Sequence, residues 1–468
     1  MLTLAQVLAA TRGELRGSHA TELPFRRLVV DSRAVTPGAL FVALQGQKHD
    51  GHAFVAQALA QGAAGALVER IPADCAWARA ADTEGPPLIV VESTGQALLD
   101  MARYALDRQP NLEVVGITGS LGKTTTKEVV ASVLSTRRKV LKSEGNLNSE
   151  IGLPMTVVNG LDQPYEIAVL EMAMYQQGDI RLLARLARPR VGVVTAVLPV
   201  HLERLGTIER IQQAKQELVE ELPSNGVAVL NADDPRVAQM ATVTAARPLR
   251  YGVSEAADVR AEAISSQGLL GVYFDLLHGG ERHRVHLPLL GAQSVHAALA
   301  AAAVGLEEGL TLSEVAQALQ ELSPTLRLLV VDGINGSRVV DDSYNASPES
   351  VLAALNLLRE LPGRRKIAVL GDMLELGSEE ESSHRRVGNR AAAVLDLLIV
   401  YGPRSRATAD EARRSGLASS QVIEAGSHEE VVQLLRSRLR PGDEVLVKGS
   451  LAMGMSAVVS GIRAEGET

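Results

Sequence analysis

One segment restricts the fold more than any other: an apolar strand over 112–118 runs into a glycine-rich turn, and a helix follows over 123–134. The strand reads LEVVGIT, the turn GSLG and the helix KTTTKEVVASVL. A buried-type strand followed directly by a helix is typical of a parallel sheet covered by helices. The segment therefore predicts an α/β fold.

The turn itself has the residues of a phosphate-binding loop. Backbone N–H groups in such a turn, with the positive end of the helix dipole, can hold phosphates. Lys123 would then reach the terminal phosphates, and the Thr124 hydroxyl would bind Mg²⁺. The general pattern has a glycine five residues before Gly122, where this chain has Ile117. A tight turn without a ligand is the alternative, and we expect phosphate binding because the strand, the turn and the Lys-Thr pair all fit.

The 468 residues divide into three α/β segments in which strands and helices alternate. We expect a small α/β unit over 1–94 and a doubly wound, largely parallel sheet over 95–322. An antiparallel appendage is expected near 260–277, and a second α/β sheet over 323–468.

Composition excludes several classes of protein. Hydrophobic residues make up 46% and charged residues 22% of the chain, so extensive disorder is not expected. The net charge of −8 gives no basic excess for nucleic acid. Cys75 is the single cysteine, which excludes an intrachain disulfide and a cysteine-based zinc cluster. Without a signal peptide or a long apolar run, we expect a cytoplasmic protein that does not insert into membranes.

Polar residues follow other expected strands. Glu171 ends the strand 166–172, and the carboxyl end of a parallel strand faces the ligand crevice, where Glu171 could hold Mg²⁺. A solvated strand end is the alternative. His201 follows the strand 190–197, and Lys215 lies on a charged helix. From position alone, a structural histidine and a solvated lysine are the simpler interpretations.

A polar loop, DDSYNASP over 341–348, joins a strand to a helix in the third segment. Its acids, Tyr344 and Asn345 are suited to ligand binding, whereas Ser347 before a proline indicates simple helix capping. GDMLELG over 371–377 and KGS over 448–450 also end strands. Several polar strand ends in one segment indicate a site that faces another domain.

Six segments together resemble the Mur ligase family of peptidoglycan synthesis. They are DSRAVTPGALFVALQGQKHDGHAF (31–54), GITGSLGKTTTKE (116–128), EGNLNSEIGLP (144–154), HLE with QAKQE (201–217), DDSYNASPES (341–350) and VLGDMLELG (369–377). The resemblance spans nearly the whole chain. The last two segments are the most specific to the member that adds D-alanyl-D-alanine, and the Asn-Pro-Arg motif of the lysine- or diaminopimelate-adding member is not visible.

The resemblance implies a UDP-substrate domain, a central ATPase domain and a C-terminal Rossmann-like domain. It also implies ATP-dependent amide formation. A carboxylate of UDP-N-acetylmuramoyl-tripeptide attacks the γ-phosphate of ATP to give an acyl phosphate, and the amine of D-alanyl-D-alanine displaces phosphate. Mg²⁺ and lysine neutralise the crowded anions. The expected partners are these small molecules, with a monomeric chain.

The resemblance also assigns roles to individual residues. ATP would be bound by Gly119, Ser120, Gly122, Lys123, Thr124, Thr125, Asn146, Arg327 at the γ-phosphate and Asp342 at the ribose. The metal would be held by Thr124, Glu171, His201 and Lys215. Lys215 would be carbamylated, because a carbamate supplies the oxygen atoms that Mg²⁺ prefers. The residues implied in catalysis are Lys123, Lys215, His201, Arg327 and Asp342.

Substrate binding is assigned in the same way. Ser32 and Arg33 would belong to the UDP site, and Tyr344, Asn345 and His384 would lie near the dipeptide, with Lys448 also at the substrate.

The chain departs from the family pattern mainly at neutral hydrogen-bonding residues. These departures are Leu121, Ser149, Ala196, Gln293, Ser294, Ala297 and Leu451. A weakly active relative that binds nucleotide or precursor without ligation therefore stays open, as does a Mur-like ligase with another amine. The retained metal and phosphate residues favour an enzyme, because a pure binder has no need of a second metal site.

Overall fold

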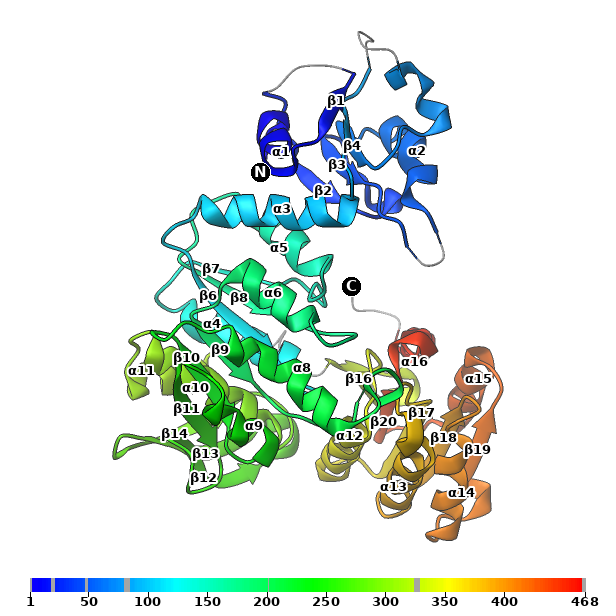
Figure 1. Cartoon of the computed structure of the whole chain (residues 1–468). Helices are drawn as coiled ribbons and strands as arrows, with labels where there is room; N and C mark the ends of the chain where they lie inside the picture. The colour runs from blue at the N-terminus through cyan, green and yellow to red at the C-terminus, as the bar shows by residue number, and fades with distance from the viewer. Residues whose placement is uncertain are drawn as a thin grey trace.

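The computed structural model describes residues 2–17, 22–46, 49–79, 85–200, 202–323 and 329–464. It contains three sheets in successive stretches of the chain, and Figure 1 shows helix α3 lying between the first sheet and the central one. The mixed α/β architecture with three sheet-bearing domains confirms the expected fold class. The domain boundaries after residues 94 and 322 stay predictions.

The first sheet has the order β1-β5-β4-β3-β2, with β1 antiparallel to β5 and the other pairs parallel. Its elements are α1 (Leu4–Thr11), β1 (Glu14–Arg16), β2 (Arg27–Val29), η1 (Ser32–Ala34), β3 (Ala39–Val42), η2 (Gly51–Phe54), α2 (Val55–Ala60), β4 (Gly65–Val68), η3 (Ala73–Arg79) and β5 (Leu88–Val90). A side chain of the central domain binds the backbone of the edge strand β2. The Asn159 side chain accepts the Leu28 N–H at 2.7 Å and donates to the Leu28 carbonyl at 3.0 Å. This contact fixes the first domain against the second.

The central sheet has the order β14-β13-β12-β11-β10-β9-β6-β8-β7 and is parallel from β7 to β12. Its strands are β6 (Glu113–Thr118), β7 (Val140–Lys142), β8 (Ile167–Glu171), β9 (Val191–Val194), β10 (Val227–Asn231), β11 (Arg247–Gly252), β12 (Val259–Ser266), β13 (Val272–His278) and β14 (Glu281–Leu287). The antiparallel pairing of β12, β13 and β14 confirms the appendage expected near 260–277.

Helices cover both faces of the central sheet, which explains why its strands are continuously apolar. On one face the core includes side chains of α3, α5, α6 and α8, and on the other those of α4, α10 and α11. These helices and the short ones between them are α3 (Thr94–Asp107), α4 (Lys123–Leu134), α5 (Gly152–Gly160), α6 (Asp179–Ala187), α7 (Leu202–Leu205), α8 (Ile208–Glu220), α9 (Pro235–Gln239), η4 (Met240–Thr242), η5 (Gly268–Leu270), α10 (Ser294–Glu307) and α11 (Leu312–Gln320).

The third sheet has the order β15-β16-β20-β17-β18-β19 and is parallel except for β15. Its elements are β15 (Leu329–Asp332), η7 (Ile334–Gly336), β16 (Arg338–Asp342), α12 (Pro348–Glu360), β17 (Arg365–Gly371), η8 (Gly377–Glu379), α13 (Glu380–Ala392), β18 (Leu397–Tyr401), α14 (Arg406–Arg414), η9 (Ser419–Gln421), β19 (Val422–Ala425), α15 (His428–Arg438), β20 (Asp443–Lys448), η10 (Leu451–Met453) and α16 (Ser456–Ile462).

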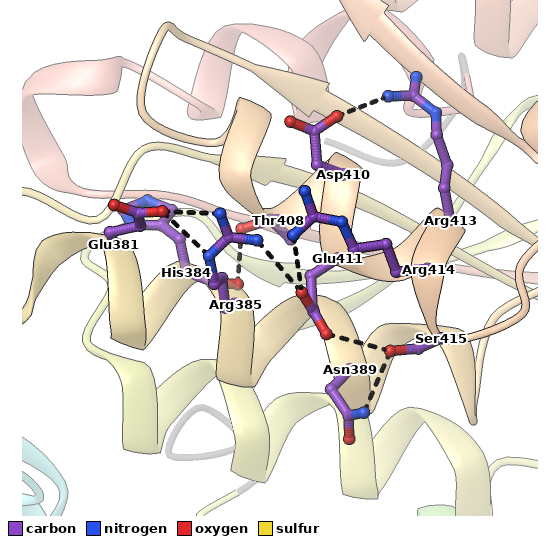
Figure 2. Close-up of polar contacts among 10 residues, drawn as sticks. All are labelled: Glu381, His384, Arg385, Asn389, Thr408, Asp410, Glu411, Arg413, Arg414 and Ser415. Carbon is purple, nitrogen blue, oxygen red and sulfur yellow. Dashed lines mark hydrogen bonds and ion pairs between the residues drawn. The ribbon is translucent and has the colours of Figure 1, made fainter.

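Hydrogen bonds and ion pairs join α13 to α14 in this domain (Figure 2). Arg385 of α13 binds Glu381 on its own helix at 2.6 Å and Glu411 of α14 at 3.2 Å. Thr408 of α14 donates its hydroxyl to the His384 carbonyl at 3.1 Å. The network fixes the helix that carries His384.

Across the described residues, every helix is too short or too polar to cross a bilayer.

Candidate active site

The phosphate turn between β6 and α4 has a backbone that only glycine allows at one position. Gly119 has φ +150°, and a Cβ there would lie 1.8 Å from the Thr195 hydroxyl. The same hydroxyl donates to the Leu121 carbonyl at 2.6 Å, and the Ser120 N–H donates to the Ala196 carbonyl at 2.7 Å. The residues that follow β9 therefore hold the shape of the turn.

Helix α4 begins directly after this turn. Its N-cap is Gly122, at φ +81°, which provides no side chain to cap the first turn of the helix. The first backbone N–H groups of a helix have no partner within the helix, so this end favours an anion. The Thr124 and Thr125 side chains in that first turn are exposed.

Lys123 folds back over the turn. Its ammonium donates to the Gly119 carbonyl at 2.8 Å. Desolvation lowers the pKa of Lys123, and the charge of Glu171 acts in the opposite direction. The lysine is therefore a poorly solvated cation at the mouth of the phosphate turn.

Glu171, at the end of β8, is 1% exposed, so it is not the solvated strand end that its position alone allowed. One carboxylate oxygen accepts from the Thr124 hydroxyl at 3.0 Å, and the other accepts from the Asn148 amide at 2.8 Å. Its backbone N–H donates to the Ser143 hydroxyl at 3.1 Å. A carboxylate beside a hydroxyl offers the hard oxygen donors that Mg²⁺ prefers, so Thr124 and Glu171 fit a magnesium site. Within the described ranges, three or more His, Cys, Asp or Glu side chains never gather as a metal cluster.

Lys215 lies in α8 and is 2% exposed. The charged composition of this helix had favoured a solvated lysine, so the structure differs from that expectation. Desolvation lowers the pKa of Lys215 well below its usual value, and the charge of Lys123 lowers it further. The structure thus brings Lys123, Glu171 and Lys215 into one electrostatic environment. Two other predicted residues, His201 and Arg327, lie outside the described residues.

The C-terminal domain contributes a second group of predicted residues. Lys448, 2% exposed at the end of β20, pairs with Asp342 at the end of β16 at 2.7 Å. The same ammonium donates to the Asn345 carbonyl at 2.8 Å. Desolvation raises the pKa of Asp342, although the Lys448 charge opposes this shift. These two predicted ligand-binding groups therefore bind each other in this structure.

Tyr344 connects this group to the central domain. The Asn146 side chain of the central domain lies next to its hydroxyl. Desolvation raises the pKa of Tyr344, and the charge of Glu171 raises it further. Tyr344 is 55% exposed, which leaves its ring open to a ligand.

His384 has both ring nitrogens bound to backbone. Its Nε2 accepts the Met373 N–H at 3.2 Å, and its Nδ1 donates to the Glu380 carbonyl at 2.8 Å. Desolvation lowers the pKa of His384, which favours the neutral ring. The structure places His384 beneath the loop after β17, where it supports that loop.

The two residues predicted for the UDP site lie in the N-terminal domain, apart from the residues above. Ser32 is buried in η1, and the exposed Arg33 pairs with Asp31 at 2.7 Å. Hydrogen bonds from Arg33 lower the pKa of Asp31 to about 2.

Sequence reasoning missed Lys127, which is fully buried in α4. Its ammonium donates to the carbonyls of Ser143 at 2.7 Å and Gly145 at 3.1 Å. It therefore holds the loop that carries Asn146 and Asn148 beside Glu171. The available signal was its position on the apolar stripe of α4, three residues before Val130.

In the segment near 291–298, where the chain departs from the family pattern, the polar side chains contact other groups of the protein. The Ser294 hydroxyl donates to the Gly291 carbonyl at 2.8 Å, and the Gln293 side chain lies against Gly291. His296 pairs instead with Asp233 at 2.9 Å. The hydroxyl of Ser294 is thus already engaged within its own chain.

Comparisons with known proteins give matches along most of the chain. Three family models match the chain: the Mur ligase family catalytic domain over residues 25–105, the Mur ligase middle domain over 117–305, and the Mur ligase glutamate ligase domain over 326–451. The UDP-N-acetylmuramoyl-tripeptide–D-alanyl-D-alanine ligase of Mycobacterium tuberculosis is 36% identical, over 99% of this chain and 98% of that protein.

Two solved structures are similar over nearly their full length. MurF from Acinetobacter baumannii has a TM-score of 0.83 and 28% identity, over 98% of both chains. MurF ligase from Thermotoga maritima in complex with ADP has a TM-score of 0.77 and 32% identity, over 93% of this chain and 96% of that one. With three domain models matched in order and more than 30% identity over almost the whole sequence, the chain belongs to the Mur ligase family.

Proposed function

We propose that the chain joins UDP-N-acetylmuramoyl-tripeptide to D-alanyl-D-alanine through an amide bond, while ATP is converted to ADP and phosphate. It is an ATP-dependent ligase of peptidoglycan synthesis, like its relatives. The observation that carries the proposal is the position of Lys123 and Thr124 at the uncapped N-terminus of α4, where Thr124 binds the buried Glu171 at 3.0 Å. The lysine and the unpartnered backbone N–H groups at this helix end favour an anion, and a polyphosphate fits them.

The reaction follows from the chemistry of carboxylates. A carboxylate is a poor electrophile until one of its oxygens becomes part of a good leaving group. Transfer of the γ-phosphoryl group to the tripeptide carboxylate gives an acyl phosphate, and the amine then displaces phosphate. Positioning and charge stabilisation provide most of the catalysis in such transfers. Lys123 would stabilise the charge on the transferred group.

Thr124 and Glu171 would hold Mg²⁺, which neutralises phosphate charge when bound. We further propose that Lys215 is carbamylated. An ammonium beside a metal site repels the metal, whereas a neutral amine can react with CO₂ to give a carbamate anion. The lowered pKa of Lys215 favours the neutral amine that this reaction requires. We also propose that the protein is cytoplasmic and monomeric.

A mass measurement of the product tests the proposed function. The purified protein would receive UDP-N-acetylmuramoyl-tripeptide, ATP and Mg²⁺ with D-alanyl-D-alanine, D-alanine or L-alanyl-L-alanine. We expect one amide product, formed with D-alanyl-D-alanine and with one phosphate released per product. Preference for another amine would reassign the substrate, and nucleotide binding without any product would leave a protein that binds but does not ligate.

A further inference from the structure

The central and C-terminal domains meet through a contact that none of the predicted site residues makes. Arg204 of α7 binds one carboxylate oxygen of Glu375 through Nη2 at 2.8 Å and through Nε at 3.2 Å. The Glu203 N–H donates to the Glu375 carbonyl at 3.4 Å. Glu375 lies in the loop after β17, so these bonds join a helix of the central domain to a strand end of the C-terminal domain.

An aromatic ring also contacts the guanidinium. The central carbon of the Arg204 guanidinium lies 4.9 Å from the ring centroid of Tyr175, within the range of a cation–π contact. Tyr175 follows Glu171 by four residues, and its backbone N–H donates to Asp179 at 2.8 Å. Arg204 therefore contacts the segment that leads out of the candidate metal site as well as the other domain.

The loop that presents Glu375 is fixed in an unusual conformation. Glu375 has φ +64°, a region that residues with side chains rarely adopt and that persists only where the surroundings enforce it. The loop is held by His384, which accepts the Met373 N–H, and by Ser450, whose hydroxyl accepts the Leu374 N–H at 2.9 Å. His384 thus acts on the domain contact through this loop.

The approach of the two backbones is close at the end of the same loop. Gly377 has φ +55°, and a Cβ there would lie 3.1 Å from the Glu203 nitrogen. A glycine at this position allows the loop to reach α7. The contact is therefore built from the loop after β17, the Arg204 guanidinium and the Tyr175 ring.

We infer that Arg204 is a positioning residue, which sets the C-terminal domain against the sheet edge that carries Glu171. The inference rests on the proposed function, because amide formation needs an acyl phosphate on the central side and an amine from the C-terminal side. The Arg204 and Glu375 side chains are 46% and 31% exposed, so their ion pair contributes little to stability. A displacement of about 1 Å at the reacting atoms can nonetheless lower a rate by about 100-fold.

The test uses the full-length protein with Arg204→Ala, Tyr175→Ala and the charge exchange Arg204→Glu with Glu375→Arg. Arg210→Ala on α8 is the matched control, because Arg210 is an exposed arginine of the neighbouring helix. We expect Arg204→Ala to lower kcat/KM for D-alanyl-D-alanine by about 10- to 100-fold at an unchanged melting temperature. The charge exchange should recover part of this loss, and Arg210→Ala should match the wild type.

Small-angle X-ray scattering with ATP and UDP-N-acetylmuramoyl-tripeptide provides a readout that does not depend on turnover. The Arg204→Ala protein should have a larger radius of gyration than the wild type. Wild-type kinetics and scattering for Arg204→Ala would overturn the inference, as would a loss that comes with lower thermal stability and is not recovered by the exchange. If the wild type itself formed no amide, the proposed function would fail. Scattering alone would then test the inference. A larger radius of gyration for Arg204→Ala would support it, and a radius equal to that of the wild type would overturn it.

Discussion

The central and C-terminal halves of the site differ in how their buried lysines are paired with carboxylates. In the central half, the charge of Glu171 acts on Lys123, and the charge of Lys123 adds to desolvation in lowering the pKa of the buried Lys215. In the C-terminal half, Lys448 is matched by Asp342 at 2.7 Å. A buried charge is costly unless it is paired, so the unmatched half is suited to an anionic ligand or to a lysine that loses its proton. The matched half is suited to holding a loop in place.

The largest expected effect is that of removing the cation at the phosphate turn. Lys123→Ala should lower ligation by about 1,000-fold, because a charge that stabilises the transferring phosphoryl group is lost. Its stability should change little, because the Lys123 ammonium bonds to the Gly119 carbonyl of a turn that the Thr195 hydroxyl already holds. Steady-state phosphate release and urea unfolding measure the two quantities, with the exposed Lys139→Ala as control. Near-normal turnover of Lys123→Ala would remove the phosphate-turn assignment.

Lys215→Ala tests the second unmatched lysine. We expect a loss of about 100- to 1,000-fold, with partial recovery in acetate or formate, because these small carboxylates supply the oxygens of the missing carbamate. Activity should also depend on bicarbonate in the wild type. A surface lysine would instead leave activity unchanged on substitution.

The pH dependence of Lys215 has a defined sign. Its pKa is lowered in the folded protein, so between that value and the ordinary pKa of 10.5 the unfolded chain binds more protons. Stability from this group therefore rises with pH in that window and is lost as pH falls through the folded pKa. The carbamate should disappear in the same direction, because protonation consumes the neutral amine. Activity in bicarbonate that did not fall on acidification would contradict this.

Lys448→Met removes the Lys448–Asp342 ion pair of the C-terminal half. The substitution leaves the Asp342 carboxylate in a poorly solvated place without its partner, and we expect about 2–3 kcal/mol of lost stability, since Asp342 keeps 23% side-chain exposure. Lys448→Met with Asp342→Asn should recover much of that loss. Urea unfolding measures both variants. If Lys448→Met were as stable as the wild type, the pair would not have the structural role that we give it.

The smallest expected effect concerns the nucleotide base. Gln293 and Ser294 replace residues that the family pattern uses, and the Ser294 hydroxyl already donates to Gly291. Losing one or two hydrogen bonds to the base costs about 1–3 kcal/mol, so ATP and GTP should differ by no more than about 100-fold in kcat/KM. The two nucleotides can be compared in one assay. A preference above about 1,000-fold would show that other residues read the base.

The sequence predicted the parts of the fold that are locally encoded. Apolar strands such as β6 and β8 were found because helices bury both of their faces. Strand β14 was missed because it reads ERHRVHL and lies at the edge of the sheet, where only Val285 and Leu287 are buried. Strand β7 has only three residues, too few for a periodic pattern.

Their positions at strand ends made Glu171, Asp342 and Lys448 candidates from the sequence, and in the structure they bind Thr124 or each other there. Lys127 and Asn148 were not predicted, because their roles are contacts between segments distant in sequence. The burial of Lys215 could not be read from its charged helix, and only the family resemblance indicated its role. For the same reason, nothing local to His384 shows that backbone groups occupy both ring nitrogens.

The division between the two halves is tested most directly by trapping the acyl phosphate with hydroxylamine in the absence of D-alanyl-D-alanine. Hydroxylamine displaces phosphate from an acyl phosphate and leaves a hydroxamate of the UDP-linked tripeptide, which mass spectrometry detects. We predict equal hydroxamate formation by the wild type and by Asn345→Ala in the C-terminal half, and none by Lys123→Ala. Hydroxamate formed by Lys123→Ala at the wild-type rate, or none formed by the wild type with ATP and Mg²⁺, would contradict the account.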